Sequence, residues 1–191
     1  QEASEDLRVY GGIVVSGRQI HRLVQVTGPQ IERAQAQAPA VELAAPLPVL
    51  YVSVDGTGAP MVAEALVGRT GKQPDGSAKT REVKLGCVVT QHVLDEEGRP
   101  VRDPASTTYL CGLETAADFG TRLRQEALRR GMGQSRRTVL LGDGAAWIWE
   151  LGRVNFAHAL EILDYYHGRE HLTDLVHGLE AQGTASANAR G

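Results

Sequence analysis

The sequence predicts an α/β fold, in which a mixed β-sheet is flanked by helices and preceded by a short helical N-terminal segment. Three β-like segments come first, between residues 49 and 113, and strand-like and helix-like segments alternate after them. Strands that follow one another directly, and then strands that alternate with helices, together predict a mixed sheet covered by helices. The composition, 42% hydrophobic and 23% charged, is that of an ordinary globular domain, so the chain can bury a core of this kind.

The N-terminal part predicts a helix followed by a linker. Residues 13–28 have helical apolar spacing, with Ser16 as the N-cap and Gly28 as the stop. This helix suits simple packing, and the alternative is the second helix of a partial helix-turn-helix that faces DNA. Residues 29–48 are rich in alanine and glutamine and then in proline, which predicts a helix that leads into an extended linker. We therefore assign residues 1–45 to a helical N-terminal segment.

The elements of the predicted core follow from the residue pattern. The β-branched, alternating segment VLYVSVDGTG predicts a buried strand that ends at Asp55, and REVKLGCVVTQHVLD and RPVRDPASTTYLCGL predict the second and third strands. Residues 114–131 predict a helix, because acidic residues come early, arginines come late and a glycine closes it. RRTVLLGDGAAWIWEL then predicts a strand that ends at Asp143 and turns into a helix.

The last segment, FAHALEILDYYHGREHLTDLVHGL, predicts a strand followed by a long helix. The complete order is three strands, helix, strand, helix, strand, helix, and the ribonuclease-H-like fold has this order. We assign residues 46–180 to such a core, a mixed sheet flanked by helices, and residues 181–191 to a flexible tail.

Asp55 and Asp143 are the candidate catalytic residues. Each stands at the predicted end of an apolar strand and is followed directly by glycine. In a ribonuclease-H-like sheet the first and fourth strands are neighbours, so the two carboxylates would converge. Hard oxygen ligands suit Mg²⁺, and two such ions roughly 4 Å apart promote phosphodiester cleavage. The alternative is ordinary Asp-Gly turn chemistry, which the same dipeptides also satisfy.

Four phrases, YVSVDGTGAPM, REVKLGCVVTQ, VLLGDGAAWIWEL and ILDYYHGREHL, carry a family resemblance. In this order and spacing the chain resembles transposases of the ISKra-type bacterial insertion sequences, relatives of the Mutator-like group, over roughly residues 10–178. The resemblance implies that Asp55 and Asp143 are the first two catalytic aspartates and bind Mg²⁺ or Mn²⁺. It also matches Asp164 and His167 to a D-x-x-H signature that supports the site.

The resemblance further implies a third catalytic acid, a glutamate, which lies beyond a largely helical insertion. The chain begins at Gln1 and ends in the small-residue run AQGTASANARG. We therefore expect a C-terminally truncated catalytic-core fragment that lacks the third acid and is inactive alone.

The function that the resemblance implies is DNA transposition by metal-dependent phosphodiester cleavage and strand transfer. Its partners would be DNA, as transposon ends and target, and further copies of the full-length protein; its place would be the bacterial cytoplasm, associated with the nucleoid. No apolar run approaches the roughly 18 residues of a membrane-spanning helix. Because the formal net charge is −3, phosphate contacts would depend on local basic residues. The candidates, for which solvated surface charge is the alternative, are Arg81, Lys84, Arg136, Arg137 and Arg169.

Two rival functions stay open at this stage. The first is an inactive transposase remnant or a DNA-binding fragment. The second is a zinc peptidase, because His167, Glu170 and His171 satisfy the motif H-x-x-E-H, with Glu180 as the candidate for the downstream third ligand. A partly exposed helix that carries two histidines explains the same motif without zinc.

Overall fold

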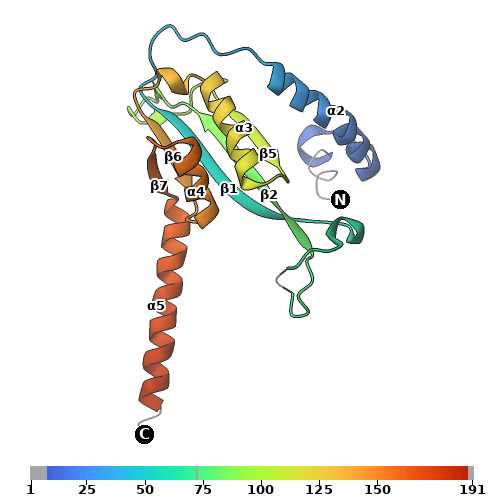
Figure 1. Cartoon of the computed structure of the whole chain (residues 1–191), viewed down its shortest axis with the longest axis vertical. Coiled ribbons are helices and arrows are strands. Elements are labelled where there is room, and N and C mark those ends of the chain that lie inside the picture. Colours follow the sequence, from blue (N-terminus) through green and yellow to red (C-terminus); the bar gives the residue numbers. More distant parts are fainter. Residues whose placement is uncertain (1–7, 72, 189–191) are drawn as a thin grey trace. The chain divides into compact units, whose positions relative to one another are not determined.

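The computed structural model describes residues 8–71 and 73–188, with side chains described up to residue 180. Contacts group the chain into two units, residues 1–39 and residues 40–191, and the predicted boundary near residue 45 lies a few residues beyond this division. In chain order the elements (Figure 1) are α2 (Gly17–Gln37), β1 (Leu50–Pro60), η1 (Ala63–Leu66), β2 (Thr80–Val89), β3 (Val93–Leu94), β4 (Pro100–Val101), β5 (Thr108–Gly112), α3 (Ala116–Arg129), η2 (Met132–Gln134), β6 (Thr138–Gly142), α4 (Ala146–Asn155), β7 (Leu160–Leu163) and α5 (Tyr165–Asn188).

Helix α2 makes up most of the first unit and begins where the sequence predicts. The Ser16 side chain accepts a hydrogen bond from the Gln19 amide, and the Gln19 side chain accepts one from the Ser16 amide at 2.8 Å, which forms a capping box. The predicted stop at Gly28 is wrong, since α2 continues through Pro29 to residue 37. A proline inside a helix removes a backbone donor and strains the helix, but here it does not end it. None of the residues of α2 is buried.

A five-stranded mixed sheet forms the centre of the second unit, with the strand order β5-β2-β1-β6-β7. The pairs β5–β2 and β2–β1 are antiparallel, whereas β1–β6 and β6–β7 are parallel. The predicted mixed α/β class is thereby confirmed. Strand β1 does not end at Asp55 as predicted but continues to Pro60 along β2. Its parallel pairing with β6, however, ends at Ser53, so Asp55 lies two residues beyond the parallel part of the sheet.

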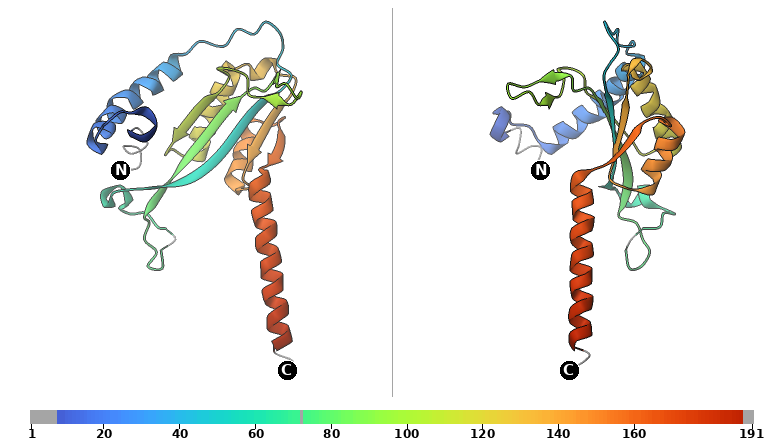
Figure 2. Two further views of the ribbon diagram at one scale, coloured as in Figure 1. Left: turned by 180° about the vertical axis from the view of Figure 1, so that it is seen from behind. Right: turned by 90° about the vertical axis from the view of Figure 1, so that its left-hand side faces the viewer.

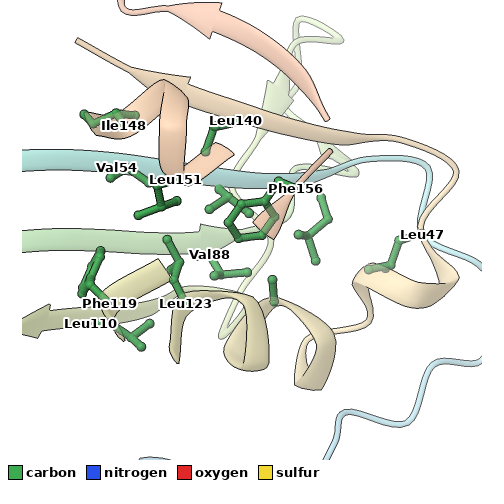
Figure 3. Close-up of a cluster of buried hydrophobic side chains, with 13 residues drawn as sticks. Leu47, Val54, Val88, Leu110, Phe119, Leu123, Leu140, Ile148, Leu151 and Phe156 are labelled. Carbon is green, nitrogen blue, oxygen red and sulfur yellow. The ribbon is translucent and has the colours of Figure 1, made fainter. Parts of the chain in front are cut away.

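Helices α3 and α4 cover one face of this sheet (Figure 2), and the hydrophobic core lies between them and the strands (Figure 3). Leu140 of β6, Phe119 of α3 and Ile148 of α4 are fully buried there. Gly152 allows α4 to approach the sheet closely, because a Cβ at this position would lie 2.5 Å from Leu140 Cδ2. Burial of each large apolar side chain contributes roughly 1.5–3 kcal/mol to the free energy of folding. This layer therefore holds β6 in place and with it the residues at both ends of the strand.

The predicted second strand, residues 81–95, is interrupted after Val89, and a two-stranded hairpin of β3 and β4 follows. Asp103 explains the interruption: its Oδ1 accepts hydrogen bonds from the amides of His92 and Val93 at 2.6 and 2.7 Å. Its Oδ2 accepts a hydrogen bond from the Thr90 hydroxyl at 2.6 Å. These amides therefore bond to a side chain instead of a neighbouring strand.

Helix α5 follows β7 directly and runs through residue 188, so the predicted flexible tail begins inside it. The remaining tail residues, 189–191, lie outside the described residues. None of the helices in the described part of the chain combines the length and the apolar character that crossing a bilayer requires.

Candidate active site

The pairing of β1 with β6 aligns Asp55 with Asp143. The paired residues in this ladder are 88 positions apart, as in Leu50 with Thr138 and Ser53 with Leu141. Asp55 and Asp143 are also 88 positions apart, so the same register, extended by two residues, places them opposite each other. Adjacent strands lie about 4.8 Å apart. The two carboxylates that the sequence singled out thus start from neighbouring backbone positions.

A third aspartate, Asp164, continues the row on the next strand. Residues paired between β6 and β7 are 21 positions apart, as in Gly142 with Leu163, and Asp143 and Asp164 have the same separation. The ladder reaches this position, because the Asp164 amide donates to the Gly142 carbonyl at 2.8 Å. Asp55, Asp143 and Asp164 form what we call the carboxylate row, at the carboxyl ends of the parallel pairings.

The row belongs to the sheet face that α3 and α4 do not cover. Side chains alternate between the faces of a strand, and Val54 and Leu140 point into the core. Asp55 therefore lies on the other face, as does Asp143, which is three positions beyond Leu140. Glu161 of β7 is on the helix side, since its Oε1 would lie 3.3 Å from a Cβ built on Gly152.

Each carboxylate of the row uses Oδ1 to hold local backbone. Asp55 Oδ1 accepts a hydrogen bond from the Gly56 amide at 2.6 Å, and Asp143 Oδ1 accepts one from the Ala145 amide at 2.8 Å. Gly144, between Asp143 and Ala145, has φ +100°, a conformation that favours glycine. The turn into α4 therefore uses the Asp143-Gly144 pair. The Asp-Gly turn chemistry is thus present. Within the described residues Oδ2 of Asp55 and Oδ2 of Asp143 make no hydrogen bond, which leaves them for a ligand.

Asp164 caps α5 and holds His167. Its Oδ1 accepts hydrogen bonds from the amides of Tyr166 and His167 at 2.9 and 3.1 Å, and it lies 3.1 Å from His167 Nδ1. The hydrogen bond with Asp164 raises the pKa of His167; desolvation opposes this effect, and the charges of Asp164, Asp143 and Asp55 add to it. His167 therefore lies close enough to Asp55 and Asp143 for their charges to favour its protonated form.

The row has the donor type of a hard cation, but the side chains are not gathered into a finished metal centre. Among the described residues, no group of three or more His, Cys, Asp and Glu side chains is placed to hold a metal ion. Two carboxylates from adjacent strands, each with one oxygen available, fit a site that shares ligands with solvent or substrate, as Mg²⁺ sites commonly do.

The predicted phosphate-binding residues do not gather at the row. Arg81 donates to the Leu113 carbonyl, and Lys84 is 8% exposed on the helix-covered face, 3.0 Å from Glu82 Oε2 and over the ring of Trp147. Lys84 is thus engaged inside the protein, so a phosphate role for it is disfavoured.

The three remaining predicted cations lie in two places. Arg136 and Arg137 directly precede β6, at the end of the strand opposite to Asp143. Arg169 lies on the first turns of α5, where it lines a depression together with Asp164. Arg169 is therefore the predicted basic residue that lies near the row.

The zinc-peptidase hypothesis finds no third ligand in the described part of the chain. His167 and His171 are one turn apart on α5, but His167 Nδ1 is engaged by Asp164. Glu180 lies nine positions beyond His171 on the same helix, about 13 Å along its axis at 1.5 Å per residue. A continuous helix cannot bring it back to the two histidines.

Comparisons with known proteins add no family assignment. No family model matches the chain, and no curated protein matches it. Among solved structures, the chain is similar to one titled "Crystal structure of NurA", with 13% sequence identity and a TM-score of 0.17. The alignment covers 69% of this chain and 29% of that one. A TM-score this low carries no argument about fold or function.

Proposed function

We propose that this chain is the core of a DNA transposase of the ribonuclease-H-like class, which cleaves and rejoins phosphodiester bonds with the help of Mg²⁺ or Mn²⁺. The observation that carries the proposal is the alignment of Asp55 with Asp143 on adjacent parallel strands. Catalytic carboxylates that share divalent cations must converge in this way from distant parts of a sequence.

The topology supports the ribonuclease-H-like assignment. The three antiparallel strands of the sheet, β1, β2 and β5, come first in the chain; after α3, β6 pairs in parallel with β1, and after α4, β7 pairs in parallel with β6. This is the order of the fold that the resemblance implies. The choice of DNA as the substrate rests on that resemblance, with its phrases around Asp55, Asp143 and Asp164.

The residues of the row have distinct roles in this proposal. Asp55 and Asp143 hold the cation through the carboxylate oxygens that the backbone does not use. A divalent cation held there would supply electrostatic stabilisation of the charge on the reacting phosphate oxygens. Asp164 fixes the first turn of α5 and orients His167 beside the site. The nucleophiles are water and then a DNA 3′-hydroxyl, so no side chain forms a bond to the substrate.

The proposal is tested by the effect of a divalent cation on DNA binding. Without a cation, the negative charges of Asp55 and Asp143 repel a phosphodiester. A Ca²⁺ ion bound between them would neutralise these charges and attract the phosphodiester. We expect Ca²⁺ to strengthen binding of a labelled duplex severalfold over EDTA, measured by fluorescence anisotropy at fixed ionic strength. The double variant Asp55→Asn/Asp143→Asn should lose this difference. Glu96→Gln, an exposed glutamate on the turn between β3 and β4, is the matched control and should keep it.

The outcome also separates the proposal from its rival. Binding of DNA that is equally strong in Ca²⁺ and EDTA, and unchanged in the double variant, would favour a DNA-binding fragment or remnant over a metal-dependent core.

A further inference from the structure

A groove of about 770 Å³ lies at the end of the sheet opposite to the carboxylate row. It is lined by residues from three places: α3, the segment that leads into β6, and the turn between α4 and β7. Both β6 and β7 begin at the groove, with Thr138 and Leu160 in its wall. The row stands where the same two strands end, so the groove is a separate site.

The lining of the groove is strongly basic. Arg124, Arg136 and Arg137 contribute three guanidinium groups and His158 an imidazole, and no acidic residue is among the described residues that line it. We call these four residues and the space between them the basic groove. All four side chains are exposed.

The three arginines of the basic groove are free to bind a ligand. Among the described residues, Arg124, Arg136 and Arg137 have no ion pair, whereas Arg99 and Arg122 are paired with glutamate or aspartate. Three guanidinium groups at one groove whose described lining holds no acidic side chain create a locally positive surface on a protein of net charge −3. Their placement therefore points to a negatively charged ligand.

The rest of the lining suits a phosphodiester more than an isolated charge. Exposed Val154 and Leu160 offer apolar contact of the kind a sugar makes, whereas Ser135 and Asn155 already hydrogen-bond within the protein. The groove includes the C-terminal end of α4, whose helix dipole carries about −0.5 charge. Three full positive charges outweigh this partial negative charge.

We propose that the basic groove binds the phosphate backbone of duplex DNA. The inference rests on the proposed function for the choice of DNA among polyanions, while the groove and its charge stand on the structure alone. Thr138 and Asp143, at the two ends of β6, are five positions apart and therefore about 16 Å apart at about 3.3 Å per residue.

The test compares two triple variants with equal loss of charge. Arg124→Gln/Arg136→Gln/Arg137→Gln removes the arginines of the groove. The control, Arg69→Gln/Lys79→Gln/Arg99→Gln, removes three exposed cations that lie elsewhere, two between η1 and β2 and one on the β3–β4 turn. Binding to a labelled 20-base-pair duplex is measured in EDTA over a range of salt concentrations, so that no cation at the carboxylate row contributes. Circular dichroism and urea unfolding establish that both variants are folded.

We expect the groove variant to bind at least about tenfold more weakly than the wild-type chain near 0.1 M salt. Its plot of log affinity against log salt should lose two to three units of slope, since each arginine contact with a phosphate contributes about one. The control should lose less than one unit. Equal behaviour of the two variants, or absence of measurable duplex binding by the wild-type chain in EDTA, would overturn the proposal.

Two further arms distinguish the ligand and the two proposals. Inorganic phosphate at low millimolar concentration should not displace the duplex; if calorimetry finds phosphate bound at the groove and duplex not bound, the DNA assignment fails. If the groove variant loses binding as expected while Ca²⁺ has no effect that depends on Asp55 and Asp143, the groove proposal stands and the metal-dependent function fails.

Discussion

The two ends of strands β6 and β7 differ in every chemical respect although they belong to the same small sheet. At the carboxyl ends lie Asp143 and Asp164, with Asp55 beside them on β1, and each side chain also serves local backbone. At the amino ends lie the arginines of the basic groove, which have no ion pairs among the described residues. The strands themselves are too short to separate these ends by more than about 16 Å.

Under the two proposals, this difference accounts for how a chain of net charge −3 would bind a polyanion. Its overall charge repels DNA, so binding must come from a local concentration of cations. The carboxylate row, by contrast, is repulsive to phosphate until a cation neutralises it. One end of the sheet would therefore bind DNA at any time, and the other only with metal.

The largest expected effect comes from breaking the support that the two ends share. Leu140 lies in the middle of β6, is fully buried and packs against α4 at Gly152. Leu140→Ala should lower the free energy of unfolding by about 2–5 kcal/mol, measured by urea unfolding, because it leaves a cavity in the core. Leu94→Ala, at a position 59% exposed in β3, is the control and should cost less than about 0.5 kcal/mol. A loss of less than about 1 kcal/mol for Leu140→Ala would mean that β6 is not held by this core.

A second prediction compares the effects on DNA binding of substitutions at the two ends. In EDTA, Asp55→Asn/Asp143→Asn should bind duplex DNA severalfold more tightly than the wild-type chain, because two repulsive charges are gone. Arg136→Gln/Arg137→Gln should bind it severalfold more weakly. Anisotropy titrations under identical salt conditions measure both. Changes of the same sign in the two variants would remove the distinction between an acidic and a basic end.

The smallest expected effect concerns His167. Its pKa is raised chiefly by the hydrogen bond with Asp164, so NMR titration should place it above the usual value of a histidine. Asp164→Asn should lower it most, Asp55→Asn/Asp143→Asn less, and Glu96→Gln not at all. A value that does not respond to Asp164→Asn would show that the pair does not form in solution.

The sign of the pH dependence follows from these two groups. The pair of protonated His167 and ionised Asp164 is complete below the ordinary pKa of histidine and is lost as the pH rises through the raised pKa of His167. It is lost at the acidic end as the pH falls through the pKa of Asp164, which the hydrogen bonds from His167 lower.

Much of the fold could be predicted from the sequence, because it depends on local patterns. Alternation of apolar residues predicted the strand around Val52, a short apolar run predicted the strand around Leu140, and the charges at the ends of residues 114–131 predicted α3. The end of the predicted second strand could not be found in this way. It depends on Asp103, which lies ten or more positions further along the chain and accepts hydrogen bonds from the amides of His92 and Val93.

The candidate site was predictable only in part. The Asp-Gly pairs and the family resemblance singled out Asp55 and Asp143, but their alignment depends on the register between β1 and β6, which no local pattern encodes. Two of the four residues of the basic groove, Arg136 and Arg137, are adjacent in the sequence and were predicted there as phosphate-binding candidates. Arg124 and His158 come from other elements, and no sequence signal links them to that pair.

The central claim, that Asp55 and Asp143 share one cation, is tested most directly by titration with Mn²⁺ followed by electron paramagnetic resonance. The wild-type chain and Glu96→Gln should bind Mn²⁺ equally. Asp55→Asn and Asp143→Asn should each weaken binding by about tenfold or more, and the double variant should be weakened by less than the product of the two effects, because both remove ligands of the same ion. Full affinity in either single variant, or effects that simply multiply in the double variant, would contradict a shared site.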